Sequence, residues 1–190
     1  EPTAWQQRAF QWRPTFELMR ARLRLWRRLH GNLPTPLRLL DDVRRHQILR
    51  LQGYLLHTGY HMSSLDLAPL AQDMIRTGER HGFCAEIGFA YVSMAVTAIA
   101  DDDPDSARRF ADLARLLADR FPDEPFTVRS RTLLAGLIEP WLGPIDPLLN
   151  GLARQYRSSW EHKDFEFTAA ASLFYAWNGL IRGVELGALG

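Results

Sequence analysis

The stretch DPDSARRFADLARLLADRF, residues 103–121, decides the fold class of this 190-residue chain. Its apolar residues recur three and four positions apart, and that spacing places them on one face of an α-helix. They are Phe110, Leu113, Ala114, Leu117 and Phe121. Asp103 followed by Pro104 is a typical helix start, because aspartate caps free N–H groups and proline fits the first turn. The stretch therefore predicts an amphipathic helix with one buried face.

Similar spacing, separated by Gly, Pro and Ser residues, continues on both sides of this stretch. Further helices are predicted over 14–31, 36–59, 64–82, 84–100, 126–141, 147–160 and 165–181. The last of these is apolar nearly all round, and we expect it to be buried on several sides. Sustained two-residue alternation is missing and valine is scarce, which disfavours β-sheet. The sequence therefore predicts an all-α fold, an irregular stack of about eight antiparallel helices similar to a tetratricopeptide-like helical repeat.

We expect one helical-repeat domain over residues 1–190. Within it, residues 1–32 form basic N-terminal helices that could serve as a docking or linker segment. Residues 35–82 form a helical hairpin, and residues 84–190 form the remaining hairpins. The chain begins without Met, which suggests a segment of a longer protein.

The composition limits which partners the chain could bind and in which cellular compartment it could work. No run of about 18 apolar residues occurs, so a membrane-spanning helix is not predicted. The single cysteine excludes an internal disulfide and favours a reducing, cytoplasmic location. Residues 1–50 hold eleven arginines against four acidic residues, whereas the remainder carries a net charge of −6. This asymmetry raises the possibility of nucleic-acid binding, but no nucleic-acid motif accompanies it, so a domain contact is the favoured interpretation.

Asp101, Asp102, Asp103 and Asp105 form an Asp-Asp-x-x-Asp string that looks like the magnesium motif of all-α terpenoid synthases. Clustered carboxylates could hold Mg²⁺ against a diphosphate. However, Pro104 interrupts the string, and carboxylates that precede a helix usually cap it. We therefore interpret these acids as a cap and loop.

The spacing of histidine and cysteine residues raises a second possibility, a metal site or a reactive thiol. His57 and His61 lie four residues apart, and His81 precedes Cys84 by three. Four such ligands could hold zinc, and a thiol at a helix start could be reactive. Gly59 separates the two histidines, however, and no Cys-x-x-Cys pair occurs. The favoured interpretation is ordinary helix-end histidines and a small buried cysteine, with no metal or other cofactor.

Aromatic residues crowd the last third of the chain and could line a ligand groove or pack between hairpins. With the polar residues beside them, they are the predicted interaction or packing residues. These are Trp141, Tyr156, Trp160, Glu161, Asp164, Tyr175, Arg182 and Glu185. The sequence contains neither a phosphate-cradling glycine-rich loop nor a Gly-x-Ser-x-Gly elbow, so no catalytic residue is predicted.

Three stretches of this region carry a family resemblance. They are LLAGLIEPW (133–141), YRSSWEHKDFEF (156–167) and, after Phe174-Tyr175, GVEL (183–186). They resemble the helical region of large multi-sensor signalling kinases, which combine a protein-kinase-like domain, a predicted signal-transduction ATPase, GAF and histidine-kinase domains. Ile138, Trp141, Tyr156, Glu161 and Asp164 fall on matching positions of that pattern. Lys163 stands where the pattern has glycine, and Phe167-Thr168 replaces Tyr-Ala.

The resemblance implies a cytoplasmic, non-catalytic helical module, a scaffold or regulatory part of a larger signal-transduction ATPase or kinase. Its expected partners are protein segments, neighbouring domains of the same chain or a second copy of it, without a membrane partner. The alternative is an all-α small-ligand sensor or a diphosphate-using enzyme with an aromatic cavity. That alternative requires a closed pocket into which the acids of 101–105 point.

Overall fold

Apolar residues spaced three and four apart fold into helices throughout the computed structural model. The structure describes residues 37–61 and 67–184, apart from the side chains of Tyr60, His61, Ile145 and Asp146, and these residues belong to one unit, Leu33–Gly190. The predicted helix over 14–31 lies outside them. The elements are α2 (Val43–His61), α3 (Leu67–His81), α4 (Ala85–Ala100), α5 (Pro104–Arg120), α6 (Pro125–Leu133), η1 (Leu134–Ile138), α7 (Glu139–Leu142), α8 (Ile145–Glu161) and α9 (Phe165–Arg182).

The predicted all-α fold class is confirmed. Because α6, η1 and α7 follow one another without a break, the described residues form seven helical rods, and the eighth predicted helix is the one over 14–31 that lies outside them. These residues contain no β-strand, and the single bridge joins Leu39 to Phe83. None of the described helices combines the length and apolarity that crossing a membrane requires.

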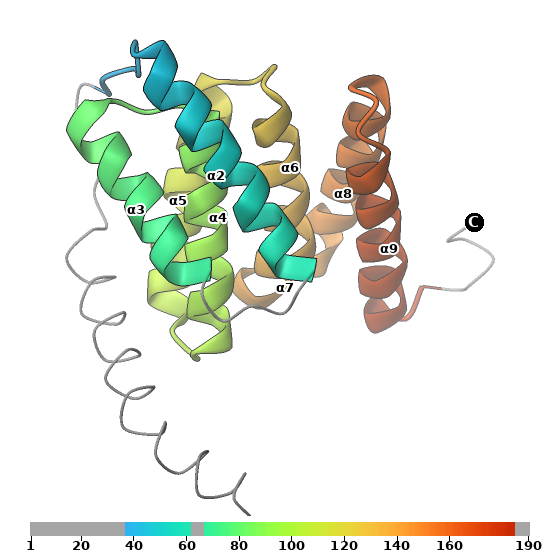
Figure 1. The fold of residues 1–190 in the computed structure, drawn as a ribbon. Coiled ribbons are helices and arrows are strands. Elements are labelled where there is room, and N and C mark those ends of the chain that lie inside the picture. Colours follow the sequence, from blue (N-terminus) through green and yellow to red (C-terminus); the bar gives the residue numbers. More distant parts are fainter. Residues whose placement is uncertain (1–36, 62–66, 185–190) are drawn as a thin grey trace, which may run out of the picture. The chain divides into compact units, whose positions relative to one another are not determined.

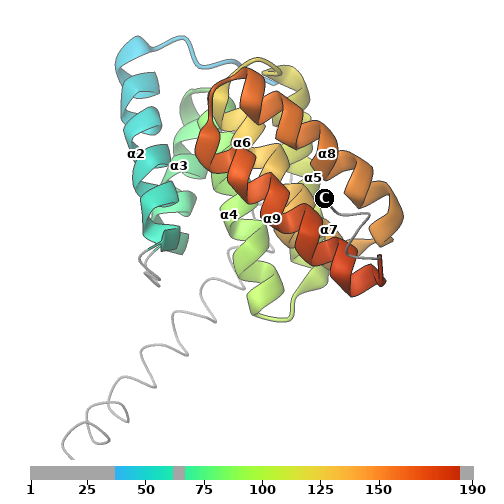
Figure 2. The same cartoon turned by 90° about the vertical axis from the view of Figure 1, so that its right-hand side faces the viewer.

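Helix α4 is the centre of the packing (Figure 1, Figure 2) and contacts α2, α3, α5 and α6. Its sequence is apolar on every side, and all residues from Ala85 to Ala95 are buried. Tyr91 stacks on Phe110 of α5, with ring centroids 6.1 Å apart. Phe110, Leu113, Ala114 and Leu117 of the predicted stripe are buried, whereas Phe121 is half-buried and follows the end of α5. Asp103 caps this helix by accepting from the Ser106 N–H at 3.1 Å.

The predicted start of the first described helix is wrong. The Thr35-Pro36 pair itself lies outside the described residues, but residues 37–42 are not helical and α2 begins at Val43. The Leu40 N–H donates to the Phe83 carbonyl at 3.1 Å, which pairs this segment with the turn before α4. Asp42 takes over the start of the helix and accepts from the Arg45 N–H at 3.0 Å.

The helix predicted over 126–141 is interrupted by the π-helical turn η1. Pro140 has no N–H, and its ring conflicts with the carbonyl four residues earlier in a regular helix, which belongs to Gly136. Wider π-turns accommodate such conflicts. The Phe174 ring of α9 packs on Gly136, at the place where a larger residue would carry its Cβ. The interruption therefore has two causes, the ring of Pro140 within the helix and the packing of Phe174 on Gly136.

The expectation that the last helix is buried on several sides is also wrong. Helix α9 packs on α8, η1 and α6, and its other face is open. Phe165, Leu173, Trp177 and Leu180 on that face are each 50–65% exposed. Hydrophobicity all round a helix indicates contact with more than one neighbour. Within the described residues, α9 has α8, η1, α6 and His57 of α2 as neighbours, and they leave the face that carries these four residues exposed.

Lys163, where the family pattern has glycine, adopts a left-handed φ of 57° in the turn between α8 and α9. Such a backbone costs a side-chain-bearing residue about 1–2 kcal/mol, which glycine does not pay. We expect Lys163→Gly to raise the unfolding free energy by about 1 kcal/mol in chemical denaturation. Asp102→Gly, also at φ 57°, is the control and should gain less, because aspartate tolerates this region. Equal gains would contradict this account.

Candidate functional site

An open groove of about 400 Å³ lies between α5 and α8, over η1 and α7. Arginines dominate the charge of its lining, which contains four arginines and one carboxylate. The charged residues are Arg108 and Arg115 of α5, Arg131 of α6, Arg154 of α8 and Glu139 of α7. The groove itself therefore carries a net charge of +3, in a chain whose net charge is only +1.

The rest of the groove is lined by apolar groups, with Gln155 as an added amide. They are Leu134, Ala135, Leu142, Gly143, Pro144, Pro147, Leu148 and Gly151. Leu134 and Ala135 belong to η1, so the π-helical turn forms part of the groove. Turns of this kind are frequent at functional sites.

Three of the four arginines are held in place by the protein. Arg108 Nη2 donates to the Leu142 carbonyl at 3.1 Å, and Arg115 Nη2 lies 3.1 Å from the Glu139 carboxylate. Arg131 Nη2 lies 3.2 Å from Asp119. Arg154 is exposed and forms no ion pair with any described residue. Arg115 also pairs through Nη1 with Asp112 at 2.7 Å, so both of its terminal nitrogens are engaged. Arg154, which has no such partner among the described residues, suits a carboxylate or phosphate ligand, because a guanidinium group can donate two parallel hydrogen bonds.

Sequence reasoning missed this groove. The one available signal is the seven-residue spacing of Arg108 and Arg115, which puts both on one face of a helix two turns apart. Nothing in the sequence says that Arg131 and Arg154, from two other helices, join them.

Three predicted residues gather on α8, where Tyr156, Trp160 and Glu161 line a shallow hollow of about 170 Å³ together with Arg157. The Trp160 ring meets Phe165 edge to face at 5.6 Å, and both remain more than half exposed. Trp141 of α7 is 71% exposed and stands apart from this hollow. These aromatics are surface residues.

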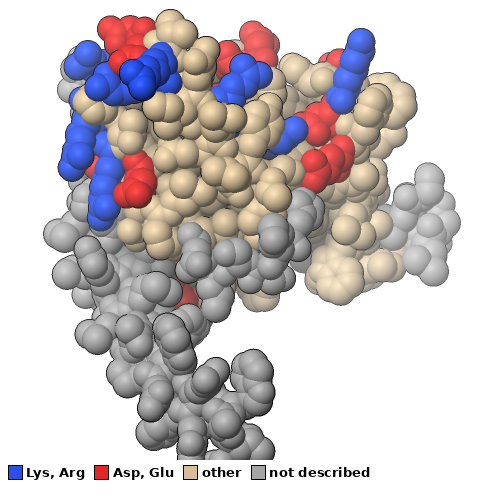
Figure 3. All heavy atoms as spheres, in the orientation of Figure 1, with Lys and Arg blue, Asp and Glu red and all other residues tan. Residues whose placement is uncertain are grey.

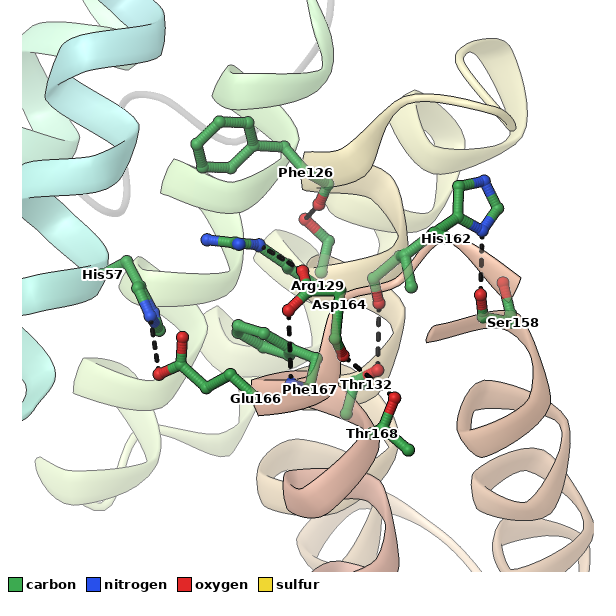
Figure 4. Close-up of polar contacts among 12 residues, drawn as sticks. His57, Phe126, Arg129, Thr132, Ser158, His162, Asp164, Glu166, Phe167 and Thr168 are labelled. Carbon is green, nitrogen blue, oxygen red and sulfur yellow. Dashed lines mark hydrogen bonds and ion pairs between the residues drawn. The ribbon is translucent and has the colours of Figure 1, made fainter. Parts of the chain in front are cut away.

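Asp164 and Tyr175 have structural positions instead. Asp164 caps α9 by accepting from the Phe167 N–H at 3.4 Å, and its Oδ2 accepts from Arg129 Nε at 2.7 Å (Figure 4). Tyr175 packs with Phe174 against a small buried cluster of α8 and η1 residues. Arg182 is exposed at the end of α9, and Glu185 lies outside the described residues.

His57 joins the first and last described helices. Its Nε2 lies 2.9 Å from the Glu166 carboxylate of α9, and its ring lies 5.3 Å from that of Phe167 (Figure 4). The side chain of His61 lies outside the described residues, so the predicted His57–His61 pair is not placed. His57 itself connects α2 to α9.

The acids of 101–105 occupy the turn between α4 and α5. Asp101 caps the end of α4, Asp102 takes a left-handed backbone, and Asp103 caps α5. None of them lines the arginine groove. The cap-and-loop interpretation describes this arrangement, whereas a diphosphate site would need the acids inside a closed chamber.

The ligand cluster that contains Cys84 includes His46, a histidine that the sequence reasoning did not consider, and it does not include His81. His46, Cys84 and Glu86 bring three potential ligand atoms within 4.8 Å of one another at the start of α4. Burial, and then the neighbouring Glu86 carboxylate, raises the pKa of the Cys84 thiol.

The exposed apolar residues of α2 form a further surface. Ile48, Leu51 and Leu55 are between 48% and 65% exposed. In Figure 3 charged side chains lie over the start of α2, along the left edge and on the right side of this face, and the area between them is largely uncharged. Comparison of the chain with known protein families, with curated proteins and with solved structures gave no match.

Proposed function

We propose that this chain is a non-catalytic helical scaffold that binds an acidic, partly apolar protein segment in the groove between α5 and α8. The observation that carries the proposal is the make-up of the groove, in which four guanidinium groups and one carboxylate border an apolar floor. Guanidinium groups bind carboxylates in pairs of hydrogen bonds, and the apolar floor accommodates leucine-like side chains. These groups recognise a partner rather than attack a bond.

The helical stack supports this role. Stacked hairpins bury a continuous core and leave extended surfaces on which partner segments can lie. Here the stack is interrupted by η1 and α7, and the groove follows that interruption. The partner is a protein segment, either from another molecule or from a neighbouring domain of the same chain.

The resemblance over residues 133–186 supports a wider proposal. In it, the scaffold is a regulatory module of a larger cytoplasmic signal-transduction ATPase or kinase whose activity resides in other domains. The acidic segment would then come from such a domain, and its docking in the groove would relay a regulatory signal.

Selection of a random peptide display library on the purified chain tests the groove. We expect the selected peptides to combine Asp or Glu with Leu or Phe, and to bind more weakly as salt rises. Arg154→Glu should weaken a selected peptide by about tenfold or more, because an attractive contact of about 1.4 kcal/mol becomes a repulsive one. Fluorescence anisotropy of the labelled peptide measures the change.

Arg157→Glu is the matched control, since it makes the same charge reversal on the same helix outside the groove. It should leave the affinity within about twofold, as expected of an exposed charge at a distance. Selection of basic peptides, or equal weakening by the two reversals, would contradict the groove as the binding site.

A further inference from the structure

The start of α4 and the first turn of α2 bring three different metal-ligating groups together. His46 Nε2 lies 3.2 Å from the Glu86 carboxylate, and Cys84 Sγ completes a set of ligand atoms within 4.8 Å of one another. In a tetrahedral zinc site, with bonds of 2.0–2.3 Å, ligand atoms lie roughly 3.5 Å apart. Small side-chain rotations would therefore suffice to bring all three atoms to one metal ion.

Backbone pairing explains why residues so far apart in sequence meet here. The Phe83 N–H donates to the Arg38 carbonyl at 2.9 Å and the Phe83 carbonyl accepts from Leu40, so the segment before α2 runs beside the turn before α4. Cys84 is the extended residue that precedes α4, and Glu86 lies in its first turn. His46 lies in the first turn of α2. The starts of α2 and α4 thus bring the side chains of His46, Cys84 and Glu86 together.

Burial and charge make this cluster unusual for a purely structural contact. The Cys84 residue is 4% exposed, and the side chain of Glu86 is 3% exposed. A carboxylate and a thiol therefore share a space largely closed to water, where a thiolate and a carboxylate would repel each other. A divalent cation between them would cancel two negative charges, and two helix N-termini favour the anionic ligands.

We propose that His46, Cys84 and Glu86 form a binding site for a zinc-like divalent transition-metal ion. A thiolate and an imidazole select such ions over Mg²⁺ and Ca²⁺, which prefer sets of oxygen ligands. Binding forms a metal–sulfur bond and releases the thiol proton to solvent. The His46 side chain is 43% exposed, so one side of the site is open to solvent, and water would complete four-coordination there.

Cobalt titration of the tag-free protein tests the site. Because Cys84 is the only cysteine, a sulfur-to-cobalt charge-transfer band in the near ultraviolet can arise only from this residue. We expect the band to saturate at one Co²⁺ per chain and to be displaced by Zn²⁺. X-ray absorption of the zinc-loaded wild-type protein should show one sulfur among nitrogen and oxygen neighbours, a readout that requires no variant.

His46→Ala and Glu86→Gln should each lower the Co²⁺ affinity by about 100-fold or more, since loss of a mere supporting partner already costs about 10- to 100-fold. Cys84→Ser should abolish the charge-transfer band. His57→Ala is the control, because His57 also pairs with a glutamate, Glu166, but outside this cluster, and it should leave cobalt binding unchanged. Absence of the band in the folded wild-type protein, or zinc binding that survives Cys84→Ser unchanged, would overturn the proposal.

Discussion

Replacing Asp164 with alanine is expected to lower the free energy of unfolding by about 3 kcal/mol, the lower end of the usual loss when one partner of a buried ion pair is removed, because this pair is part-buried. Asp164 Oδ2 accepts from Arg129 Nε at 2.7 Å, and the two side chains are only 12% and 15% exposed. The alanine would leave the Arg129 guanidinium buried without its counter-charge. It would also remove the side-chain cap on the Phe167 N–H at the start of α9.

The environment of Arg129 makes this loss hard to relieve. The guanidinium carbon lies 5.6 Å from the centroid of the Tyr54 ring. It lies 5.6 Å from the centroid of the Phe126 ring and 5.1 Å from that of the Phe167 ring, and both of these rings are labelled in Figure 4. These rings come from α2, α6 and α9, so one side chain is enclosed by three helices. Moving the guanidinium to solvent would break all three contacts, each favourable for a cation over an aromatic face.

A double-mutant cycle separates the free-energy cost of an unpaired Arg129 charge from the cost of lost packing. Arg129→Met keeps an unbranched side chain but removes the charge, so the double variant Arg129→Met/Asp164→Ala should unfold at higher denaturant concentration than Asp164→Ala alone. Chemical denaturation, followed by circular dichroism, measures both. Strictly additive losses from the two substitutions would show that the pair does not act as argued.

Helix positions could be predicted from sequence wherever a regular apolar stripe is bounded by residues with strong terminal preferences. α5 illustrates this, since Asp103 and Pro104 start it and four of the five predicted stripe residues, all but Phe121, are buried. α9 ends at Arg182, one residue beyond the predicted last position, and Gly183 after it adopts a left-handed φ of 82°. These features are local, so a single sequence contains them.

The errors come from contacts between distant residues. The start of α2 moved to Val43 because residues 38–40 pair with Phe83 instead of joining the helix. Gly59 was expected to end this helix, but α2 continues to His61 and the Leu67 side chain packs where a Cβ would stand. A glycine that stops a helix and one that admits a neighbour look alike in sequence.

The candidate sites were only partly predictable for the same reason. Aromatic density directed attention to α8, where Tyr156 and Trp160 are exposed, and their role as interaction residues stays a prediction. The four groove arginines are spread over three helices, and only the packing of those helices brings them together. In the His46–Cys84–Glu86 cluster, only the Cys-x-Glu spacing is local, and the histidine lies 38 residues before the cysteine.

Gly82→Ala is expected to destabilise the protein by about 3 kcal/mol or more. Gly82 has a φ of 116°, which residues with a side chain rarely adopt, and forcing one there costs about 1–3 kcal/mol. A Cβ at this position would also lie 2.6 Å from the carbonyl carbon and oxygen of Leu39. Because those are backbone atoms of the segment paired with Phe83, they cannot move without breaking that pairing, and overpacking adds about 1–3 kcal/mol.

For a domain of this size, the loss corresponds to a fall in melting temperature of roughly 6–12 °C. Gly183→Ala is the matched control, because Gly183 also has a positive φ but no atom within 4 Å of the added Cβ. It should cost only about 1 kcal/mol, the penalty of the backbone conformation alone. Calorimetry that gave equal shifts for the two variants would mean that the close approach of Leu39 to Gly82 contributes nothing. A larger shift for Gly82→Ala would measure the steric cost of a Cβ that meets the Leu39 backbone, where the segment before α2 lies against the turn before α4.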